Sequence, residues 1–330
     1  MIVADATQES ETIKTLRLAP SAGSKLPFKF LAGQYVDLEL QIDGKKINRS
    51  YSISSSAKQT AYIDLTIKRE PQGLASRFLC DHVRIGDSLS VRGPFGNFVF
   101  DSNSSRSVVL IGAGVGVTPL VSMLRTLIAQ RWNGGIYAAF GFRNEADGLF
   151  VKELNSLEAG NSNFHLLTTY SNRGKNKTLN AGRLTSDTIN KFIPVLKKSQ
   201  IYICGPDAMM SEMRAGLTKI GIAEKRIHIE AFTPPPRDTS KGGEYDVTFL
   251  PSDRTITGRA GETILNISER ADVNIDYSCR SGTCGLCKAK LVFGEVLMEI
   301  DDALEEDEID EGFILTCQSY PRTEIVIFGE

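Results

Sequence analysis

The chain has 330 residues, of which 41% are hydrophobic and 24% charged, and its formal net charge is −2. This length suits two or three domains with a substantial core, and the balanced charge gives no reason to expect nucleic acid as a partner. No run of 18 apolar residues occurs, so we expect no membrane span. The first residues also lack a basic and then apolar leader. We therefore expect a cytoplasmic protein with reduced thiols.

From residue 11 to about residue 101 the chain alternates in polarity over short segments that turn residues separate. Alternation with a period of two is typical of strands that have one buried face. We therefore predict a β-barrel of antiparallel strands over residues 1–103. Its clearest segments are residues 34–41, 61–68 and 88–92, and residues 93–96 (GPFG) are predicted to form a turn.

Two short motifs in this region could hold a phosphate. The first is Arg49, Tyr51 and Ser52, because arginine offers a planar fork for phosphate and a tyrosine two positions on shares its strand face. The alternative is a chance match with a half-buried strand tyrosine. The second motif is a glycine-led helical pattern after Lys68, with Gly73, Ala75 and Ser76, whose free N–H groups could face a pyrophosphate.

At residues 107–111 (SVVLI) the chain becomes continuously apolar, which is typical of a strand buried on both faces of a parallel sheet. Three glycines follow, and then a helical pattern for which Thr118 is the predicted N-cap. Such a turn can bind a dinucleotide phosphate, but a tight structural turn explains two of the glycines equally well. The glycines are Gly112, Gly114 and Gly116.

Further apolar strands alternate with helical stretches, which predicts an α/β domain with a parallel sheet over residues 104–232. The predicted strands are residues 136–140, 164–169 and 200–204. Ligands of such sheets bind at the carboxyl ends of the strands. The last strand ends in Cys204, Gly205, Pro206 and Asp207, where a helix is predicted to begin. By itself, Cys204 is best interpreted as a small buried apolar residue.

Residues 233–243 (TPPPRDTSKGG) have the composition of a linker, and residues 244–330 form a third predicted domain. We expect strands at residues 245–250 and 324–328 and a short helix at residues 262–271. The run from Glu299 to Glu311 holds nine acidic residues. It is either a solvated helical face with a turn or a docking surface for a basic partner.

Four cysteines in the third domain have the spacing of a metal centre. Cys279, Cys284 and Cys287 are spaced C-x4-C-x2-C, and Cys317 follows after 29 residues. This is the plant-type pattern in which four thiolates bind a [2Fe-2S] cluster. A zinc site would need a second C-x2-C or a histidine pair. A disulfide would need an oxidising compartment. We therefore predict the cluster.

The barrel motifs, taken together with GPFGNF at residues 93–98, resemble the flavin domain of the ferredoxin-NADP reductase superfamily. The resemblance implies that Arg49 holds the cofactor phosphate, that Tyr51 packs on the isoalloxazine ring and that Ser52 lies near its reactive edge. It places Ala75 and Ser76 on the pyrophosphate, with Lys68 and Gly73 in the same binding segment. This segment favours FAD over FMN.

The glycine turn and the later CGP resemble the nicotinamide half of the same superfamily. The resemblance implies that Thr118 and Cys204 lie near the nicotinamide and flavin rings, where hydride is transferred beside Ser52. It also places Phe232 near the flavin, although a strand-end core aromatic is the alternative. Arg143, Ser171 and Arg173 are candidates for a 2'-phosphate and favour NADPH over NADH, unless the arginines are only solvated loop cations.

The third domain resembles a plant-type ferredoxin, an α+β fold of the β-grasp kind. The order flavin, nicotinamide and iron-sulfur resembles the reductase components of bacterial oxygenases, including those of phenylacetyl-CoA epoxidase and steroid 9-alpha-hydroxylase. This implies an NAD(P)H oxidoreductase that passes electrons through FAD and [2Fe-2S] to a partner oxygenase. An electron donor to a lipid desaturase and a non-catalytic redox sensor or electron-transfer subunit remain alternatives. Replacing Cys279 by serine should separate reduction of a protein acceptor from reduction of a dye.

Overall fold

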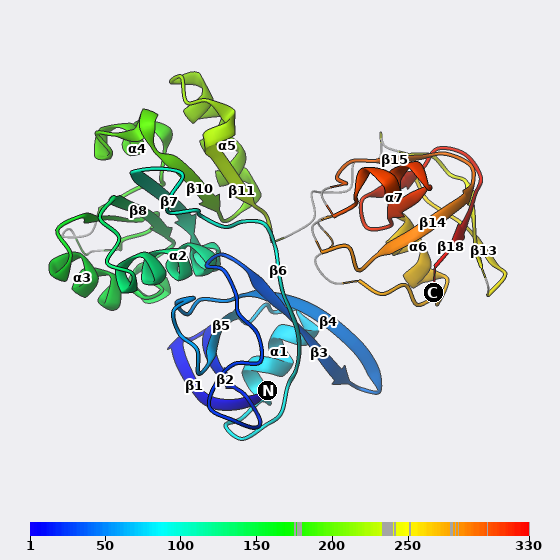
Figure 1. The fold of residues 1–330 in the computed structure, drawn as a ribbon, viewed down its shortest axis with the longest axis horizontal. Helices are drawn as coiled ribbons and strands as arrows, with labels where there is room; N and C mark the ends of the chain where they lie inside the picture. Colours follow the sequence, from blue (N-terminus) through cyan, green and yellow to red (C-terminus); the bar gives the residue numbers. More distant parts are fainter. Residues whose placement is uncertain are drawn as a thin grey trace. The chain divides into compact units, whose positions relative to one another are not determined.

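The fold was analysed in a computed structural model (Figure 1). The structure describes residues 1–174, 176, 180–232, 240, 242–250, 252–277, 280, 282, 284–301 and 303–329. The chain forms two compact units, Met1–Phe232 and Thr233–Glu330. Within the described residues, no helix has the length and apolar character needed to span a bilayer.

The first unit begins with six strands in two antiparallel sheets of three. One sheet has the order β1-β2-β5 and the other β4-β3-β6. Isolated bridges from Ile2 to Ser88 and from Ile53 to Leu65 connect the two sheets. The strands are β1 (Ile2–Ser10), β2 (Ile13–Ala19), β3 (Tyr35–Ile42), β4 (Lys45–Ser52), β5 (Ile63–Lys68) and β6 (Ser90–Phe95).

Strand β1 lies before the alternating stretch that begins at residue 11, but within the predicted domain. It lacks alternation because only its Val3 is buried. One local prediction for these sheets is wrong. The predicted turn at residues 93–96 is largely strand, since β6 continues to Phe95, which pairs with Tyr35 after a register shift. Helix α1 (Leu74–Asp81) packs against β3 and β5 and buries Ala75 and Leu79 in the core.

The second half of this unit is built on a parallel five-stranded sheet of order β11-β10-β7-β8-β9, which confirms the predicted parallel sheet. Apolar residues on both faces of β7 explain its continuous apolar sequence. The strands are β7 (Ser107–Ala113), β8 (Gly135–Phe142), β9 (Phe164–Tyr170), β10 (Gln200–Cys204) and β11 (Ile227–Glu230).

Helices cover both faces of the parallel sheet. Val108 and Leu110 of β7 point to one face and pack with α2 and α3, whereas Val109 and Ile111 point to the other and pack with α4 and α5. The helices are α2 (Val117–Ala129), α3 (Val151–Gly160), α4 (Ser186–Phe192) and α5 (Asp207–Lys219). Short 3-10 turns are η1 (Gly114–Gly116), η2 (Glu145–Asp147), η3 (Leu196–Lys198) and η4 (Glu224–Arg226).

The second unit has a mixed sheet of order β13-β12-β18-β14-β16, in which only β12 and β18 are parallel, and a separate pair of β15 with β17. Helix α6 buries Ile264, Leu265 and Ile267 in its core. The elements are β12 (Asp246–Leu250), β13 (Arg254–Thr257), α6 (Ile264–Arg270), β14 (Lys288–Phe293), β15 (Val296–Met298), α7 (Glu306–Asp310), β16 (Phe313–Leu315), β17 (Ser319–Pro321) and β18 (Ile325–Phe328). Most of the predicted linker, 233–243, lies outside the described residues.

Candidate functional site

Strand β4 carries the three candidate flavin residues side by side. Arg49 and Tyr51 lie two positions apart, so both side chains leave the same face of the strand. Arg49 is exposed, and its Nη1 donates to the carbonyl oxygen of Asn48 at 2.8 Å. Ser52, the last residue of the strand, is buried. The strand thus presents a cation and an aromatic ring on one face.

Tyr51 is half-buried at the edge of the core between the two antiparallel sheets, which Cys80 of α1 also contacts. Burial raises the pKa of the Tyr51 phenol well above its usual value, and the Arg49 guanidinium offsets part of that rise. The phenol therefore stays neutral at physiological pH. A neutral aromatic ring beside an exposed arginine is a suitable surface for a flat, phosphate-bearing ligand.

The amino end of α1 is the second candidate phosphate site. Gly73 is the N-cap residue and no side chain caps this end, so the first N–H groups of the helix have no partner within it. Ser76 Oγ accepts from the Glu70 amide at 3.1 Å and holds the preceding loop. A Cβ added at Gly73 would lie 2.3 Å from Ser76 Oγ. Lys68, at the end of β5, pairs with Glu70 at 2.8 Å.

The glycine turn after β7 packs directly on the end of β10. Gly112 and Cys204 are register partners in the sheet. A Cβ added at Gly116 would lie 2.6 Å from the Cys204 carbonyl oxygen and 2.6 Å from Gly205 Cα. These distances leave no room for a side chain, so Gly116 allows the turn and the start of α5 to approach. Gly114, by contrast, has φ +56° with open space around it.

Thr118 is not the N-cap of α2, contrary to the prediction. The 3-10 turn η1 leads into the helix, which begins at Val117 with Gly116 as its N-cap. Thr118 therefore lies inside the first turn, where it is 2% exposed and its hydroxyl donates to the Val115 carbonyl oxygen at 2.8 Å. Its side chain stabilises the turn from within.

Cys204 is a free thiol with no exposed surface. Burial raises its pKa well above the usual thiol value, and nearby Glu230 raises it further. The residue therefore remains a neutral thiol and packs as the sequence alone suggested. Pro206 follows as the N-cap of α5, and Asp207 is in the first turn of that helix, where a carboxylate stabilises the helix dipole.

Glu230 is a site residue that the sequence analysis missed. It is the register partner of Cys204 at the end of β11. Burial raises the pKa of its carboxyl group to about 8, and its Oε2 has no hydrogen-bond partner among the described residues. The only signal in the sequence was an acid at the end of the short segment IHIE. Phe232 lies two residues on and is 46% exposed, so it is not a core aromatic.

Arg143, Ser171 and Arg173 lie together on the loops that follow β8 and β9. The Arg143 carbonyl oxygen accepts from the Asn172 amide at 2.7 Å and joins the two loops. The Arg143 side chain is 81% exposed and lies 3.8 Å from Asp147. Because the strands are parallel, these loops are at the same edge of the sheet as the glycine turn.

The four cysteines of the third domain fall partly outside the described residues, since Cys279 is one of the residues that the structure does not describe. Among those that it does describe, no three His, Cys, Asp or Glu side chains surround one point. Cys287 and Cys317 are both buried. They lie on neighbouring segments, because Thr316 donates through its amide at 3.0 Å and its hydroxyl at 2.9 Å to the Cys287 carbonyl oxygen.

The backbone around these cysteines suits ligation by a loop. Gly282 and Gly285 have φ of +77° and +72°, a conformation that glycine adopts readily and that turns backbone N–H groups inward. Gln318 Nε2 donates to the Arg280 carbonyl oxygen at 2.9 Å and ties the loop to the segment of Cys317. The donor set and its supporting hydrogen bonds fit a cluster with thiolate ligands.

Three known domain families match the chain in succession. Residues 1–100 match an oxidoreductase FAD-binding domain, residues 110–215 an oxidoreductase NAD-binding domain and residues 247–322 a 2Fe-2S iron-sulfur cluster binding domain. The glycine betaine monooxygenase reductase subunit of Pseudomonas aeruginosa is 30% identical over 325 residues, which are 93% of this chain and 89% of that protein. The chain belongs to this reductase family.

Other relatives of the reductase extend over nearly its whole length. A subunit of the 1,2-phenylacetyl-CoA epoxidase from Escherichia coli is 29% identical over 99% of the reductase and 96% of its own length. The ferredoxin reductase component of 3-ketosteroid-9-alpha-monooxygenase from Mycobacterium tuberculosis is 27% identical over 98% of the reductase and 93% of its own length. The structure of phthalate dioxygenase reductase is 25% identical in sequence and superposes with a TM-score of 0.69. The match covers 99% of this chain and 96% of that chain.

These matches confirm the resemblance that the sequence motifs indicated. The reductase is a multidomain oxidoreductase with FAD-, NAD- and 2Fe-2S-binding domains. For the third domain, the iron-sulfur match supports the cluster over the zinc and disulfide alternatives.

Glu230 gives the reductase a predicted pH dependence. The unfolded chain releases this proton near 4.5, whereas the folded protein retains it up to about 8. The folded state therefore binds more protons in this window, and its stability falls as the pH rises, by up to about 1.4 kcal/mol per pH unit. Urea unfolding followed by circular dichroism at pH 5.5 and 8 should show this loss in the wild type and a smaller loss in Glu230→Gln. Replacing the exposed Glu212 by Gln should leave the loss intact, and equal slopes in all three proteins would contradict the assignment.

Proposed function

We propose that this reductase takes electrons from NAD(P)H and delivers them to a partner oxygenase or hydroxylase. The observation that carries the proposal is the likeness over nearly the full length to reductase components of the glycine betaine, phenylacetyl-CoA and ketosteroid enzymes. When bound, the FAD supplies a ring that accepts electrons as a pair from the nicotinamide and gives them up singly to the [2Fe-2S] cluster.

The residues of the first unit then have distinct tasks. Arg49 binds the FAD phosphate, Tyr51 covers one face of the ring, and Ser52 lies at its reactive edge. The amino end of α1 binds the pyrophosphate through the N–H groups near Gly73, Ala75 and Ser76, with Lys68 beside it. Opposite this site the nicotinamide is held by the two adjoining strand ends, and Phe232 lies near the flavin ring. These strand ends comprise Gly112, Gly114, Gly116, Thr118, Cys204, Gly205, Pro206 and Asp207.

The adenosine end of the nucleotide is assigned to the loops after β8 and β9. Arg143 is exposed and Ser171 and Arg173 lie on the neighbouring loop, so two guanidinium groups lie where they suit a 2'-phosphate. We therefore propose NADPH as the preferred donor, with NADH as the competing one.

The second unit would hold the cluster through Cys279, Cys284, Cys287 and Cys317. Its mixed sheet packed by α6 supports a β-grasp ferredoxin fold. In the first unit, the two bridges that connect the sheets support a closed barrel. We accordingly divide the chain into a flavin domain at 1–103, a nucleotide domain at 104–232, a linker at 233–243 and a ferredoxin domain at 244–330, and we place the protein in the cytoplasm.

The decisive experiment is a visible spectrum of the purified protein during anaerobic titration with NADPH and, separately, NADH. Bleaching of the flavin and then of the cluster absorbance is expected, with faster bleaching by NADPH. A protein that contains flavin and iron but is bleached by neither nucleotide would overturn the proposal, and faster bleaching by NADH would overturn the nucleotide assignment alone.

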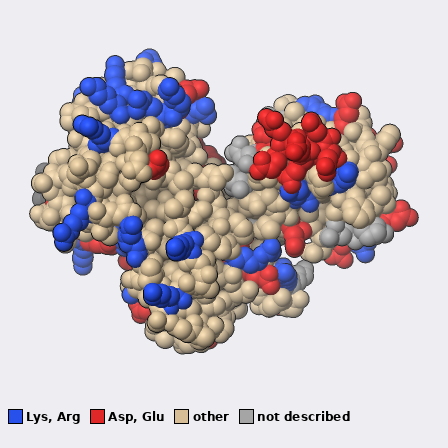
Figure 2. All heavy atoms as spheres, viewed as in Figure 1, with Lys and Arg blue, Asp and Glu red and all other residues tan. Residues whose placement is uncertain are grey.

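The acidic run from Glu299 to Glu311 is the proposed docking surface for the partner. Figure 2 shows a dense group of acidic side chains around α7. Glu306, Asp307 and Asp310 are exposed, whereas Glu308 pairs with Lys288 and closes a capping box with Glu305. These three exposed carboxylates all lie on α7, where together they can attract a basic partner.

Neutralising these three carboxylates should slow electron delivery to a basic acceptor. Glu306→Gln, Asp307→Asn and Asp310→Asn together should lower the rate with cytochrome c by about 3- to 10-fold at low salt, and the difference should vanish at about 0.5 M salt. The matched control replaces Glu244, Glu295 and Glu324 by Gln, because these side chains lie at the surface of the same unit and the charge change is equal. Equal losses of rate in the two triple variants would contradict a docking role for α7.

A further inference from the structure

Helix α2 joins the two candidate halves of the reaction site through polar contacts near its middle. Ser122, Arg125 and Thr126 lie three and four residues apart and therefore share one face of the helix. We name these three residues the α2 contact set. Ser122 Oγ donates to the Ser55 carbonyl oxygen at 2.7 Å and Arg125 Nη1 to the Ser54 carbonyl oxygen at 2.6 Å. These contacts reach the segment that follows strand β4.

Thr126 completes the set, and its hydroxyl both donates and accepts a hydrogen bond. Its Oγ1 donates to the Ser122 carbonyl oxygen at 2.7 Å, so its lone pairs remain for the Ala57 amide, which donates to it at 2.8 Å. The Arg125 guanidinium is held in place as well. It pairs with both carboxylate oxygens of Glu153 at 2.8 and 2.6 Å and lies 4.6 Å from the centre of the Phe150 ring.

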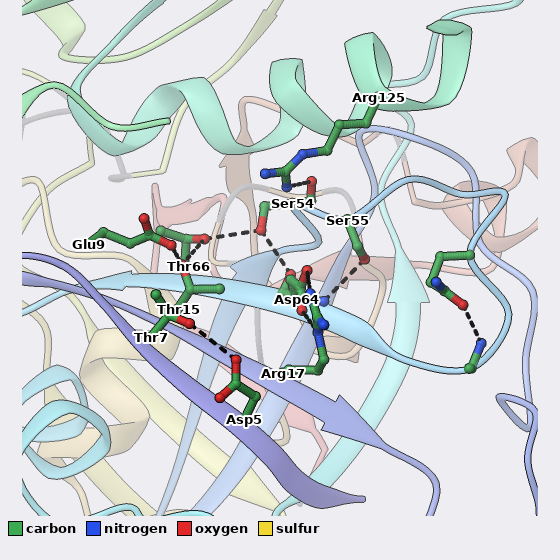
Figure 3. Close-up of polar contacts among 12 residues, drawn as sticks. Asp5, Thr7, Glu9, Thr15, Arg17, Ser54, Ser55, Asp64, Thr66 and Arg125 are labelled. Carbon is green, nitrogen blue, oxygen red and sulfur yellow. Dashed lines mark hydrogen bonds and ion pairs between the residues drawn. The ribbon is translucent and has the colours of Figure 1, made fainter. Parts of the chain in front are cut away.

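The segment that the α2 contact set holds is fixed on its other side by the barrel. The Ser54 amide donates to the Asp64 carbonyl oxygen at 2.8 Å, and the Asp64 amide donates to Ser55 Oγ at 3.1 Å. Ser54 Oγ also contacts Thr66 Oγ1 at 3.0 Å. Figure 3 shows Arg125 extending from the helix toward Ser54, with Ser55 and Asp64 on the barrel side. The segment therefore cannot shift independently of either α2 or β5.

The polar contacts matter because part of the junction is open. A cavity of about 720 Å³ is lined by Asp5 and Glu9 of β1, by Arg17 of β2 and by Lys152 and Glu153 of α3. The sheet β1-β2-β5 and α3 are thus separated by solvent-sized space along this side. Arg125 of the α2 contact set lines this cavity, and the set as a whole connects the barrel to the nucleotide half.

The α2 contact set and the segment it holds each lie a few residues along the chain from a residue proposed to lie beside the reacting rings. Ser54 follows the flavin candidate Ser52 by two residues of extended chain, and Ser122 follows Thr118 by about one helical turn. We propose that Ser122, Arg125 and Thr126 are positioning residues that set the separation between the nicotinamide and the flavin ring. They act through Ser52 and Thr118, and the inference rests on the function proposed above.

The expected effect is on the rate of flavin reduction and not on nucleotide binding. Hydride transfer requires reacting atoms about 3 to 3.5 Å apart, and a misplacement of about 1 Å costs on the order of 100-fold. Thr126→Val keeps the shape but removes the acceptor of the Ala57 amide. It should lower the limiting rate of flavin bleaching by NADPH about 10-fold per bound flavin, with KM changed less than about twofold because uniform binding is untouched.

Three further proteins and one further measurement test the proposal. Thr126→Ser keeps the hydroxyl and should restore most of the rate, and Ser122→Ala should repeat the loss. Thr188→Val, which removes a hydroxyl that bonds only within the start of α4, should leave the rate unchanged. Hydrogen–deuterium exchange without nucleotide should show faster exchange of the peptide around Ala57 in Thr126→Val alone.

A normal limiting rate in Thr126→Val and Ser122→Ala would overturn the positioning role. A loss that appears only as reduced flavin content or a raised KM would overturn it as well, because the residues would then be merely structural. If the wild type binds flavin but is not bleached by either nucleotide, the proposed function fails instead, and the exchange measurement still reports on the contact.

Discussion

Replacing Cys317 by serine is expected to abolish electron delivery to a one-electron protein acceptor while NADPH continues to reduce a dye such as ferricyanide. A serine oxygen is a poor substitute for a thiolate ligand, and Cys317 is buried. The rate with cytochrome c should fall by at least about 100-fold and the dye rate by less than about twofold. Stopped-flow assays with both acceptors on the same preparation measure the difference.

The control for this variant is Cys80→Ser. Cys80 is a half-buried free thiol of the flavin domain outside the proposed ligand set, so both rates should stay near those of the wild type. Cys287→Ser should behave like Cys317→Ser, because the two residues lie on segments that Thr316 connects. If the dye and protein rates fell together while flavin stayed bound, the proposed route of electrons through the second unit would be wrong.

Replacing Gly116 by alanine is expected to block flavin reduction by NADPH. The new Cβ would lie 2.6 Å from the Cys204 carbonyl oxygen and 2.7 Å from its carbonyl carbon, and both are backbone atoms that cannot rotate away. The glycine turn must then separate from the end of β10, and a shift of about 1 Å at this place costs on the order of 100-fold in rate. Stopped-flow reduction at saturating NADPH measures the loss.

Gly114→Ala provides a matched comparison two residues away. Nothing lies within 4 Å of a Cβ added there, and only its φ of +56° opposes the side chain, at a cost of about 1 to 2 kcal/mol in stability. The folded variant should therefore lose much less of its flavin-reduction rate than Gly116→Ala. Equal losses at the two positions would mean that the turn needs glycine for its flexibility and not for its contact with Cys204.

The sequence predicted those parts of the fold in which one local pattern is sufficient to identify the element. The apolar run at the start of the nucleotide domain indicates a strand with two covered faces, and β7 is buried on both. The polar strand β1 was missed because its side chains are mostly exposed and its pairing with β2 is a property of the backbone. Thr118 was assigned to the wrong place in its helix because the 3-10 turn before it leaves no trace in the side chains.

The NAD-binding and 2Fe-2S domains were predictable because glycines and cysteines with fixed spacing mark them. The individual site residues remain predictions. The candidate site was not predictable where it depends on contacts between distant segments. Glu230 looked like an ordinary polar strand end until the sheet register placed it beside Cys204. Ser122 and Thr126 have no distinguishing pattern in the sequence, since a hydroxyl in a helix more often bonds its own backbone, and only the fold shows that they hold the segment after β4.

The chain contains a single tryptophan, Trp132, whose Nε1 donates to the Ser102 carbonyl oxygen at 3.2 Å and whose ring meets Phe100 edge to face at 5.3 Å. Its indole packs on the segment between β6 and β7, where the antiparallel sheets end and the parallel sheet begins. Fluorescence excited at wavelengths that only tryptophan absorbs should therefore report the unfolding of Met1–Phe232 alone. Thr233–Glu330 has no tryptophan and adds no signal. Unfolding of Met1–Phe232 can thus be followed separately in one intact chain, without a label.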